Sequence, residues 1–292
     1  PARRWAAAAV RTTRPRQWPK NLVVFAAPLA GATAGRAGGI GYALLAAVAF
    51  GCASAAVYLV NDVVDAERDR RHPVKRHRPV ASGALPRAHA LALAALAAGC
   101  ALAVGTAIAA PLLAVAVGGY LCSSFLYSAR LKQVAFVELM LVAAGFLLRV
   151  LGGAAATRVR PSVWFLLVCG LGALFVVVAK RYTELTSLGA DAVRHRPAMR
   201  WYQPRALRVI QVTVGALMLA MYLLWAYGEA AGPRAWHEAS AVPLALALSR
   251  FGVLTGRRTV RPVEEMLTGD APMLACEAAW LALFCAGLYV TG

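Results

Sequence analysis

The chain has 292 residues, of which 60% are hydrophobic and only 15% are charged. Soluble domains carry about 45–50% apolar and about 25% charged residues, so this composition excludes an ordinary water-soluble domain. The formal net charge is +18, but the basic residues gather between apolar runs, and this placement argues against a nucleic-acid partner.

Apolar runs long enough to cross a bilayer recur along the chain. A spanning helix needs about 20 predominantly apolar residues, and nine runs satisfy this, at 21–37, 40–61, 88–109, 111–128, 134–156, 161–179, 206–227, 240–256 and 272–290. We therefore predict an all-α integral membrane protein, a bundle of nine transmembrane helices that forms a single transmembrane domain over residues 1–292. Many span residues are Ala or Gly, which favours close helix packing and permits either a monomer or a homo-oligomer.

The basic residues predict the orientation. Most of the 31 Lys and Arg lie in the segment from Arg3 to Lys20 or after every second span. The positive-inside rule places this segment in the cytoplasm and the C-terminus outside. We expect the segment to belong to the mature protein, because no signal-cleavage pattern precedes a soluble domain. Cytoplasmic loops near 62–87, 129–133, 180–205 and 257–271 should form the active-site face and attract phosphorylated substrates and membrane lipids.

A cluster of carboxylates ends the second apolar run, in the segment from Asn61 to Asp69. On a helix, Asp62, Asp65 and Asp69 share one face with Asn61 beside them, while Glu67 points elsewhere. A divalent cation usually relieves the repulsion among such carboxylates, and oxygen ligands favour Mg²⁺. The cluster predicts a Mg²⁺-diphosphate site. The alternative is a solvated helix end with ordinary surface charges.

The motif Asn-Asp-x-x-Asp-x-x-x-Asp after the second span resembles that of the UbiA superfamily of intramembrane prenyltransferases, whose members have nine transmembrane helices. The resemblance extends over nearly the whole chain. Four stretches make it closest to a branch that acts in actinobacterial cell-wall arabinan synthesis: 14–21, 56–62, 75–79 and 180–185. It implies a multi-pass protein of the bacterial inner (plasma) membrane that uses Mg²⁺.

One departure from the family pattern concerns the substrates. Ordinary members carry a second Asp-rich motif after the sixth span, where this chain offers Lys180, Arg181, Tyr182 and Glu184. Cations can bind a lipid monophosphate without a metal. The resemblance therefore implies transfer of 5-phosphoribosyl from phosphoribosyl pyrophosphate to decaprenyl (polyprenyl) phosphate, with release of pyrophosphate. The alternatives are prenyl transfer to an aromatic acceptor and, from another class, a membrane transporter.

The candidate site residues follow from the motif and the resemblance together. Asp62, Asp65 and Asp69 are assigned to Mg²⁺ and catalysis, and Asn61 to diphosphate or ribose contacts. The substrate candidates are Lys20, Lys75, Arg78 and Lys132 for donor phosphates, Tyr58 and Tyr127 for the pocket, and Lys180, Arg181 and Glu184 for the lipid phosphate.

Two ionisable residues fall inside the fifth predicted span, where they are costly and are functional candidates by default. Glu138 is close enough to the cytoplasmic end to be a substrate-binding candidate, whereas Arg149 lies deeper and is expected to be structural. The five histidines, including His77 and His237, fall in or beside connections and are expected to be surface or loop residues. Of these, His77 is a candidate phosphate contact.

Overall fold

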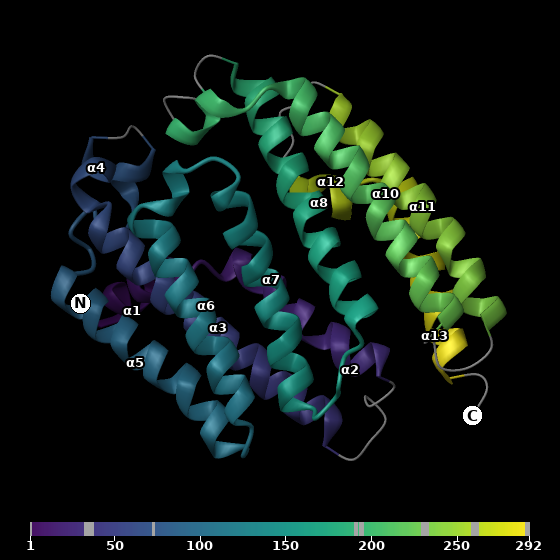
Figure 1. The fold of residues 1–292 in the computed structure, drawn as a ribbon. Coiled ribbons are helices and arrows are strands. Elements are labelled where there is room, and N and C mark those ends of the chain that lie inside the picture. The colour runs from purple at the N-terminus through teal and green to yellow at the C-terminus, as the bar shows by residue number, and fades with distance from the viewer. Residues whose placement is uncertain are drawn as a thin grey trace. The chain divides into compact units, whose positions relative to one another are not determined.

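The computed structural model describes residues 2–31, 38–71, 74–189, 192, 196–228, 234–257 and 263–289. The regular elements in these ranges are all helices (Figure 1). They divide into two compact units, one made of residues 1–129 and 148–160 and the other of residues 130–147 and 161–292. Each unit is described separately below, and the single domain over 1–292 stays a prediction.

Eight helices of the described chain are long and apolar enough to cross a membrane. They are α3 (Gly39–Val64), α5 (Arg87–Ala107), α6 (Pro111–Ala129), α7 (Val137–Ala156), α8 (Val163–Leu188), α10 (Pro204–Gly228), α11 (Arg234–Gly256) and α13 (Ala271–Tyr289). Each matches one predicted run, from the second to the ninth. The chain is therefore a multi-pass integral membrane protein.

The first predicted run, 21–37, is described only as far as Gly31. This part contains the end of the 3-10 helix η1 (Pro15–Phe25) and the short helix α2 (Ala26–Ala30). Pro19 in η1 and Pro28 in α2 lack the N–H that a continuous α-helix needs, so the chain from Pro15 to Ala30 is broken into short helices.

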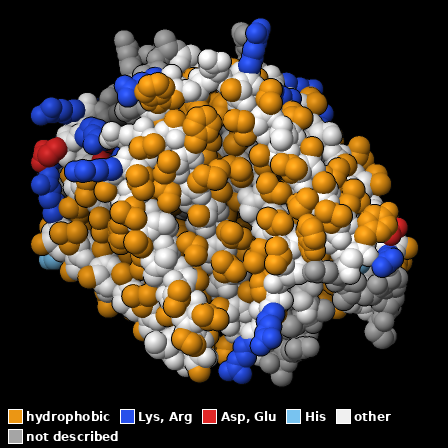
Figure 2. Space-filling view, in the orientation of Figure 1, with side chains coloured by type: hydrophobic (Ala, Val, Ile, Leu, Met, Phe, Trp, Pro, Cys, Tyr) orange, Lys and Arg blue, Asp and Glu red, His pale blue; other side chains and the backbone are white. Residues whose placement is uncertain are grey.

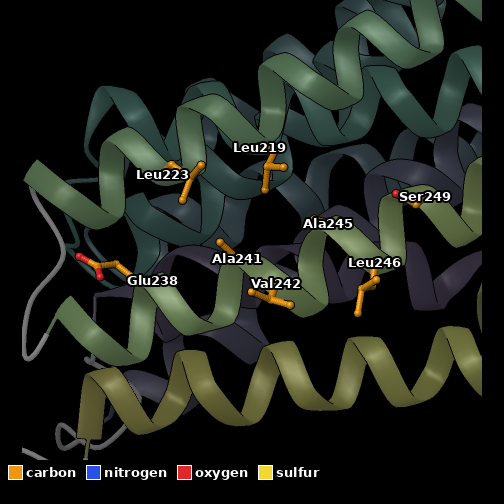
Figure 3. A pocket seen from close by; sticks show the side chains of 8 residues that line it. All are labelled: Leu219, Leu223, Glu238, Ala241, Val242, Ala245, Leu246 and Ser249. Atoms are coloured by element: carbon orange, nitrogen blue, oxygen red, sulfur yellow. The ribbon is translucent and has the colours of Figure 1, made fainter.

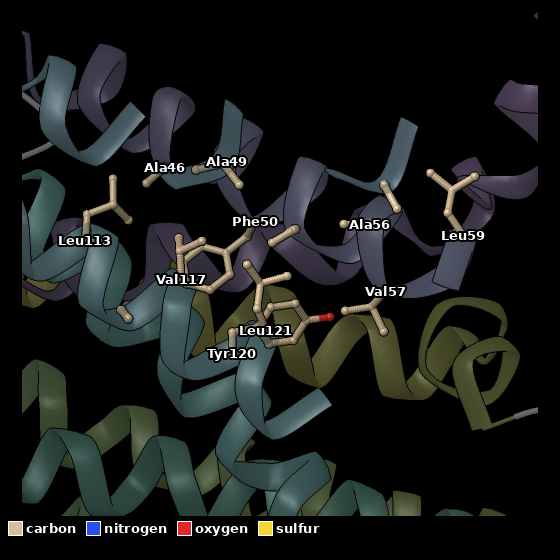
Figure 4. Close-up of a cluster of buried hydrophobic side chains, with 14 of the residues drawn as sticks. Ala46, Ala49, Phe50, Ala56, Val57, Leu59, Leu113, Val117, Tyr120 and Leu121 are labelled. Atoms are coloured by element: carbon tan, nitrogen blue, oxygen red, sulfur yellow. The ribbon is translucent and has the colours of Figure 1, made fainter. Parts of the chain in front are cut away.

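Unit 1 contains η1, α2, α3, α5, α6 and the second half of α7, together with α1 (Ala2–Thr12), α4 (Ala66–Arg70) and η2 (Lys75–His77). Its core contains Phe50, Leu113, Val117, Tyr120 and Leu121, with the ring of Phe50 between Leu113 and Tyr120 (Figure 4). The rings of Phe50 and Tyr120 meet edge to face at 5.8 Å, a favourable arrangement for aromatic pairs.

A glycine in α7 permits a very close backbone contact in this unit. A Cβ atom at Gly153 would lie 1.9 Å from the carbonyl oxygen of Val24 in η1. No side chain fits in that space, so Gly153 allows the broken segment η1 to pack directly on the helix.

Unit 2 begins with η3 (Leu131–Gln133) and the first half of α7. It continues with α8, α10, α11 and α13, with η4 (Pro197–Trp201) between α8 and α10 and α12 (Val263–Gly269) between α11 and α13. The rings of Phe175 and Phe251 pack 5.4 Å apart in one of its cores. His237 is fully buried in α11 with its ring 5.1 Å from that of Trp225. The prediction that His237 is a surface or loop residue is wrong, because aromatic rings enclose it.

Large apolar side chains lie on the surface of the described chain. Leu112, Val115, Val209 and Val212 are each at least 60% exposed. Figure 2 shows hydrophobic side chains across the visible face, with Lys and Arg toward its margins. Such a surface is unfavourable in water and suits contact with lipid tails.

Two predicted loops begin later than the sequence suggests. α3 continues to Val64 and therefore contains Asn61 and Asp62. α8 continues to Leu188, so Lys180, Arg181 and Glu184 are helical residues and not part of a loop at 180–205.

Candidate active site

Two carboxylates of unit 1 share one guanidinium. Asp62 lies on the last turn of α3 and Asp69 on α4, and the side chain of each is almost completely buried. Nη1 of Arg78 is 2.7 Å from Oδ2 of Asp69 and 3.5 Å from Oδ1 of Asp62. The i, i+7 spacing thus brings these two carboxylates to a common cation, even though α3 ends between them and Asp65 caps it.

A second arginine, which sequence reasoning missed as a site residue, completes this group. Nη2 of Arg14 donates to Oδ1 of Asp62 at 2.7 Å, and its guanidinium lies 4.7 Å from the ring centre of Tyr58. Arg14 has a positive φ of 54°, just before η1 begins at Pro15. Its only signal in the sequence is its position in the stretch 14–21 that resembles the family.

The remaining carboxylates of the motif have other partners. Asp65 lies 3.5 Å from Nη2 of its neighbour Arg68. Glu67 points away from the buried pair, as predicted, and is bonded to Arg87 and Arg70 on the surface. The hydrogen bond from Arg87, followed by the charge of Arg70, lowers the pKa of Glu67.

The chain after α4 folds back over the motif. Nε of Arg70 donates to the carbonyl oxygen of Ala81 at 3.0 Å, and the amide of Leu85 donates to the carbonyl oxygen of Pro79 at 2.9 Å. These bonds fix the segment that carries Arg78. The predicted site residues Lys20, Asn61 and Tyr127 are half-buried in unit 1, and Lys75 is exposed. His77, the candidate phosphate contact, is exposed as well.

Among the described residues, no three His, Cys, Asp or Glu side chains are grouped closely enough to hold a metal ion. The predicted set of Asp62, Asp65 and Asp69 is therefore not assembled in this arrangement. Asp62 and Asp69 remain paired through Arg78, so they supply oxygen donors of the kind that Mg²⁺ prefers.

A deeper polar network of unit 1 surrounds Arg149. Its Nε donates to Oδ1 of Asn21 at 2.9 Å and its Nη2 to Oγ of Ser54 at 3.1 Å, while its guanidinium lies 4.4 Å from the ring centre of Tyr120. These contacts join η1, α3, α6 and α7. They support the expectation that Arg149 is structural.

Unit 2 contains a separate ionic cluster around Glu138, whose side chain is fully buried. Arg181 binds it with two hydrogen bonds, from Nε at 2.6 Å and from Nη2 at 2.8 Å. Nη1 of Arg196 donates to it at 2.9 Å, and the hydroxyl of Tyr202 at 3.3 Å. Sequence reasoning missed Arg196 and Tyr202, since both follow the predicted motif at a distance along the chain.

The same cluster determines what its side chains can do. The remaining guanidinium nitrogen of Arg181, Nη1, donates a hydrogen bond to the carboxylate of Glu184 at 2.8 Å. Arg181 is thus committed to two carboxylates, whereas Arg196 is about a quarter exposed. Burial, reinforced by the nearby charge of Glu138, raises the pKa of Tyr202 to about 12. Tyr202 therefore stays protonated and acts as a hydrogen-bond donor to Glu138.

Lys132 and Lys180 are the other predicted site residues of unit 2. Lys132 is half-buried in η3 and Lys180 is exposed on α8. Unit 2 also has a shallow apolar groove of about 380 Å³ between α10 and α11 (Figure 3). Its lining contains none of the predicted site residues, and Glu238 is its one charged side chain.

Comparison with known proteins identifies the family to which the chain is similar. The sequence model of the UbiA prenyltransferase family matches residues 22–263. The decaprenyl-phosphate phosphoribosyltransferase of Mycobacterium tuberculosis is 34% identical over 284 residues, covering 94% of this chain and 92% of that protein. Its namesake from Corynebacterium glutamicum is 33% identical over 304 residues, covering 99% and 89%.

The solved structures agree on the fold. A UbiA homolog from Archaeoglobus fulgidus, bound to GPP and Mg²⁺, superposes with a TM-score of 0.72 at 16% identity, over 96% of this chain and 99% of that one. A digeranylgeranylglyceryl phosphate synthase superposes with a TM-score of 0.70 at 13% identity, over 97% and 98%.

Proposed function

This chain belongs to the UbiA prenyltransferase family, and from that premise we propose that it transfers 5-phosphoribosyl from phosphoribosyl pyrophosphate to decaprenyl (polyprenyl) phosphate. The products would be pyrophosphate and decaprenylphosphoryl-5-phosphoribose. The proposal depends chiefly on the near full-length similarity to relatives named decaprenyl-phosphate phosphoribosyltransferase. We place the protein in the bacterial inner membrane, with its N-terminus and active site cytoplasmic and its C-terminus outside.

Unit 1 would bind the donor. Asp62 and Asp69 would hold Mg²⁺, with Asp65 contributing through water, because one or two carboxylates plus waters and phosphate oxygens are the usual shell of this ion. The bound ion would offset the negative charge that develops on the departing pyrophosphate. Asn61 would contact the diphosphate or ribose, while Tyr58 and Tyr127 shape the pocket. Lys20, Lys75 and Arg78 are the basic side chains of this unit proposed for the donor phosphates. Lys132 belongs to unit 2, and its role as a donor-phosphate contact stays a prediction from the sequence.

The two arginines on the carboxylates have a role in this scheme. Arg14 and Arg78 neutralise Asp62 and Asp69 in the arrangement described above. When a cation of higher charge binds the same carboxylates, these guanidinium groups become available to the phosphates of the donor. We infer that Arg14 joins Arg78 as a donor-phosphate contact.

The acceptor needs little activation. A phosphate monoester is largely ionised near pH 7 because its second pKa is about 6. One of its oxygens forms the bond to the anomeric carbon of the ribose, and the bond from that carbon to the pyrophosphate oxygen breaks, with the electron pair leaving on pyrophosphate. Lys180, Arg181 and Glu184 remain proposed for the acceptor side. Lys180 is exposed and would contact the lipid phosphate, whereas Arg181 is bonded to Glu138 and Glu184 and would hold Glu184 in place.

The second candidate is prenyl transfer to an aromatic acceptor, which the family name favours. Prenyl transfer is less well supported, because the stretch after the sixth predicted span offers Lys180 and Arg181 in place of the second Asp-rich motif that ordinary members carry.

A transfer assay separates the two. Purified protein is incubated with radiolabelled phosphoribosyl pyrophosphate, polyprenyl phosphate and Mg²⁺, and label is followed into the organic phase. We expect labelled lipid, lost with EDTA and in Asp62→Asn, and retained in the matched control Glu67→Gln, whose side chain lies outside the site. Absence of labelled lipid, together with transfer from a prenyl diphosphate to an aromatic acid, would establish the second candidate instead.

A further inference from the structure

Arg208 of unit 2 is a half-buried cation whose partners are all neutral. It lies on the second turn of α10 and packs against α11. Its Nη1 donates to the carbonyl oxygen of Gly252 at 2.8 Å, to Oε1 of Gln211 at 3.2 Å and to Oγ1 of Thr255 at 3.4 Å. Gln211 and Thr255 are buried and bonded to each other at 3.3 Å. The position of the guanidinium is therefore well defined.

The other buried or half-buried arginines among the described residues of this unit have acidic partners. Arg181 and Arg196 share Glu138, and Arg250 binds Asp270 with two hydrogen bonds, at 3.0 and 2.8 Å. Within the described part of the chain, Arg208 has no such partner. A cation that is partly removed from water, at the end of a spanning helix, is stabilised by an anion close to it.

The Nε and Nη2 edge of the Arg208 guanidinium makes no hydrogen bond to a described residue. The hydrogen bonds to described residues all come from Nη1. Nη2 lies 3.7 Å from where a Cβ would stand at Gly252 or at Gly256, so no side chain at these positions covers it. The Nε and Nη2 edge is a fork that matches two oxygens of one phosphate. The ring centre of Tyr182 lies 5.8 Å from the guanidinium and supports it on α8.

The depth of Arg208 indicates the source of the phosphate. Its position as the fifth residue of α10 places it about 6 Å from the start of the helix, at a rise of 1.5 Å per residue. The next residue, Val209, is 64% exposed, as expected for a side chain that faces hydrocarbon. This level, between polar loop and lipid tail, is where the phosphate of a membrane lipid lies.

We propose that Arg208 binds the phosphate group of an anionic lipid through Nε and Nη2, at the Pro204 end of α10. Two lipids carry this chemistry. One is the polyprenyl phosphate acceptor, in which case the inference rests on the proposed function; the other is an anionic phospholipid of the surrounding bilayer.

A binding experiment without any donor tests this independently of transfer. Wild type, Arg208→Gln and the matched control Arg205→Gln, an exposed arginine one turn earlier on α10, are titrated in detergent with polyprenyl phosphate, phosphatidylglycerol and uncharged polyprenol. We expect Arg208→Gln to weaken binding of one phosphate-bearing lipid about tenfold or more, since a charged hydrogen bond contributes about 1.5–3 kcal/mol. Polyprenol binding and the Arg205→Gln control should be unchanged.

The outcomes distinguish the sources. A loss confined to polyprenyl phosphate identifies the acceptor site, and a loss that includes phosphatidylglycerol identifies a phospholipid site. Equal binding of both lipids by wild type and Arg208→Gln would overturn the proposal. If Arg208→Gln does not fold, Arg208→Lys replaces it; it keeps the charge but not the fork, so binding should still weaken several-fold, and unchanged binding counts against the proposal. A protein that binds polyprenyl phosphate through Arg208 yet transfers no phosphoribosyl group would contradict only the proposed function.

Discussion

Replacing Glu138 by Gln should destabilise unit 2 severely. The fully buried carboxylate accepts two hydrogen bonds from Arg181, one from Arg196 and one from Tyr202. Gln keeps the shape but removes the negative charge, and its amide N–H₂ faces guanidinium donors. Removing one partner of a buried ion pair costs about 3–5 kcal/mol. In a chain of this length, that loss corresponds to a fall of about 6–10 °C in the unfolding midpoint.

The assay is thermal unfolding of the detergent-purified protein, followed by tryptophan fluorescence. Glu67→Gln is the matched control, because Glu67 is exposed and its ion pairs with Arg70 and Arg87 lie on the surface. A double variant that also changes an arginine makes the test sharper. Combining Glu138→Gln with Arg196→Gln removes one of the two stranded cations and should recover part of the lost stability. If Glu138→Gln unfolds no earlier than Glu67→Gln, or if the double variant loses the full sum of both single effects, the reasoning is refuted.

Other perturbations have equally definite outcomes. Gly153→Ala places a methyl group 1.9 Å from the carbonyl oxygen of Val24 and should lower the unfolding midpoint, whereas Gly170→Ala, where a Cβ meets nothing within 4 Å, should raise it slightly. The raised pKa of Tyr202 means that the folded protein retains this proton above pH 10, so stability falls as pH rises from about 10 to about 12. Tyr202→Phe should flatten that part of the midpoint-against-pH curve, and identical slopes would contradict it. Arg78→Gln removes the cation shared by two buried carboxylates and should raise the KM for the donor more than Arg87→Gln does; equal values would exclude a role for Arg78 in the site.

The transmembrane architecture was largely predictable because hydrocarbon imposes one strong constraint, a long apolar helix. Eight predicted runs are long helices. The end of α8 was predicted too early, because the apolar run stops at residue 179 and the charged residues from Lys180 onward were assigned to a loop. Arg181 continues the helix instead, since Glu138, from another helix, neutralises its charge. A hydropathy profile treats each residue separately, so it cannot show that a carboxylate on another helix neutralises a charged side chain.

Only part of the candidate site was predictable from spacing along the chain, because Asp65 of the predicted set lies beside Arg68 instead. Asp62 and Asp69 meet at Arg78 because their separation is close to two helical turns, and Arg78 follows nine residues later. Arg14 and Arg196 were missed as site residues because their partners, Asp62 and Glu138, are 48 and 58 residues away. The enclosure of His237 depends on Trp225 and Phe284 from neighbouring helices. Such contacts exist only once the chain has folded.

The division of α7 between the two units limits how this protein could be taken apart. Its first half, with Glu138, belongs to unit 2, and its second half, with Arg149, belongs to unit 1. A gene split at the connection after Ala129 would give an amino-terminal fragment in which Asn21 and Ser54 lack their bond to Arg149. The two units are therefore not separable modules, and neither could be inherited, exchanged or expressed as an uninterrupted piece of the coding sequence.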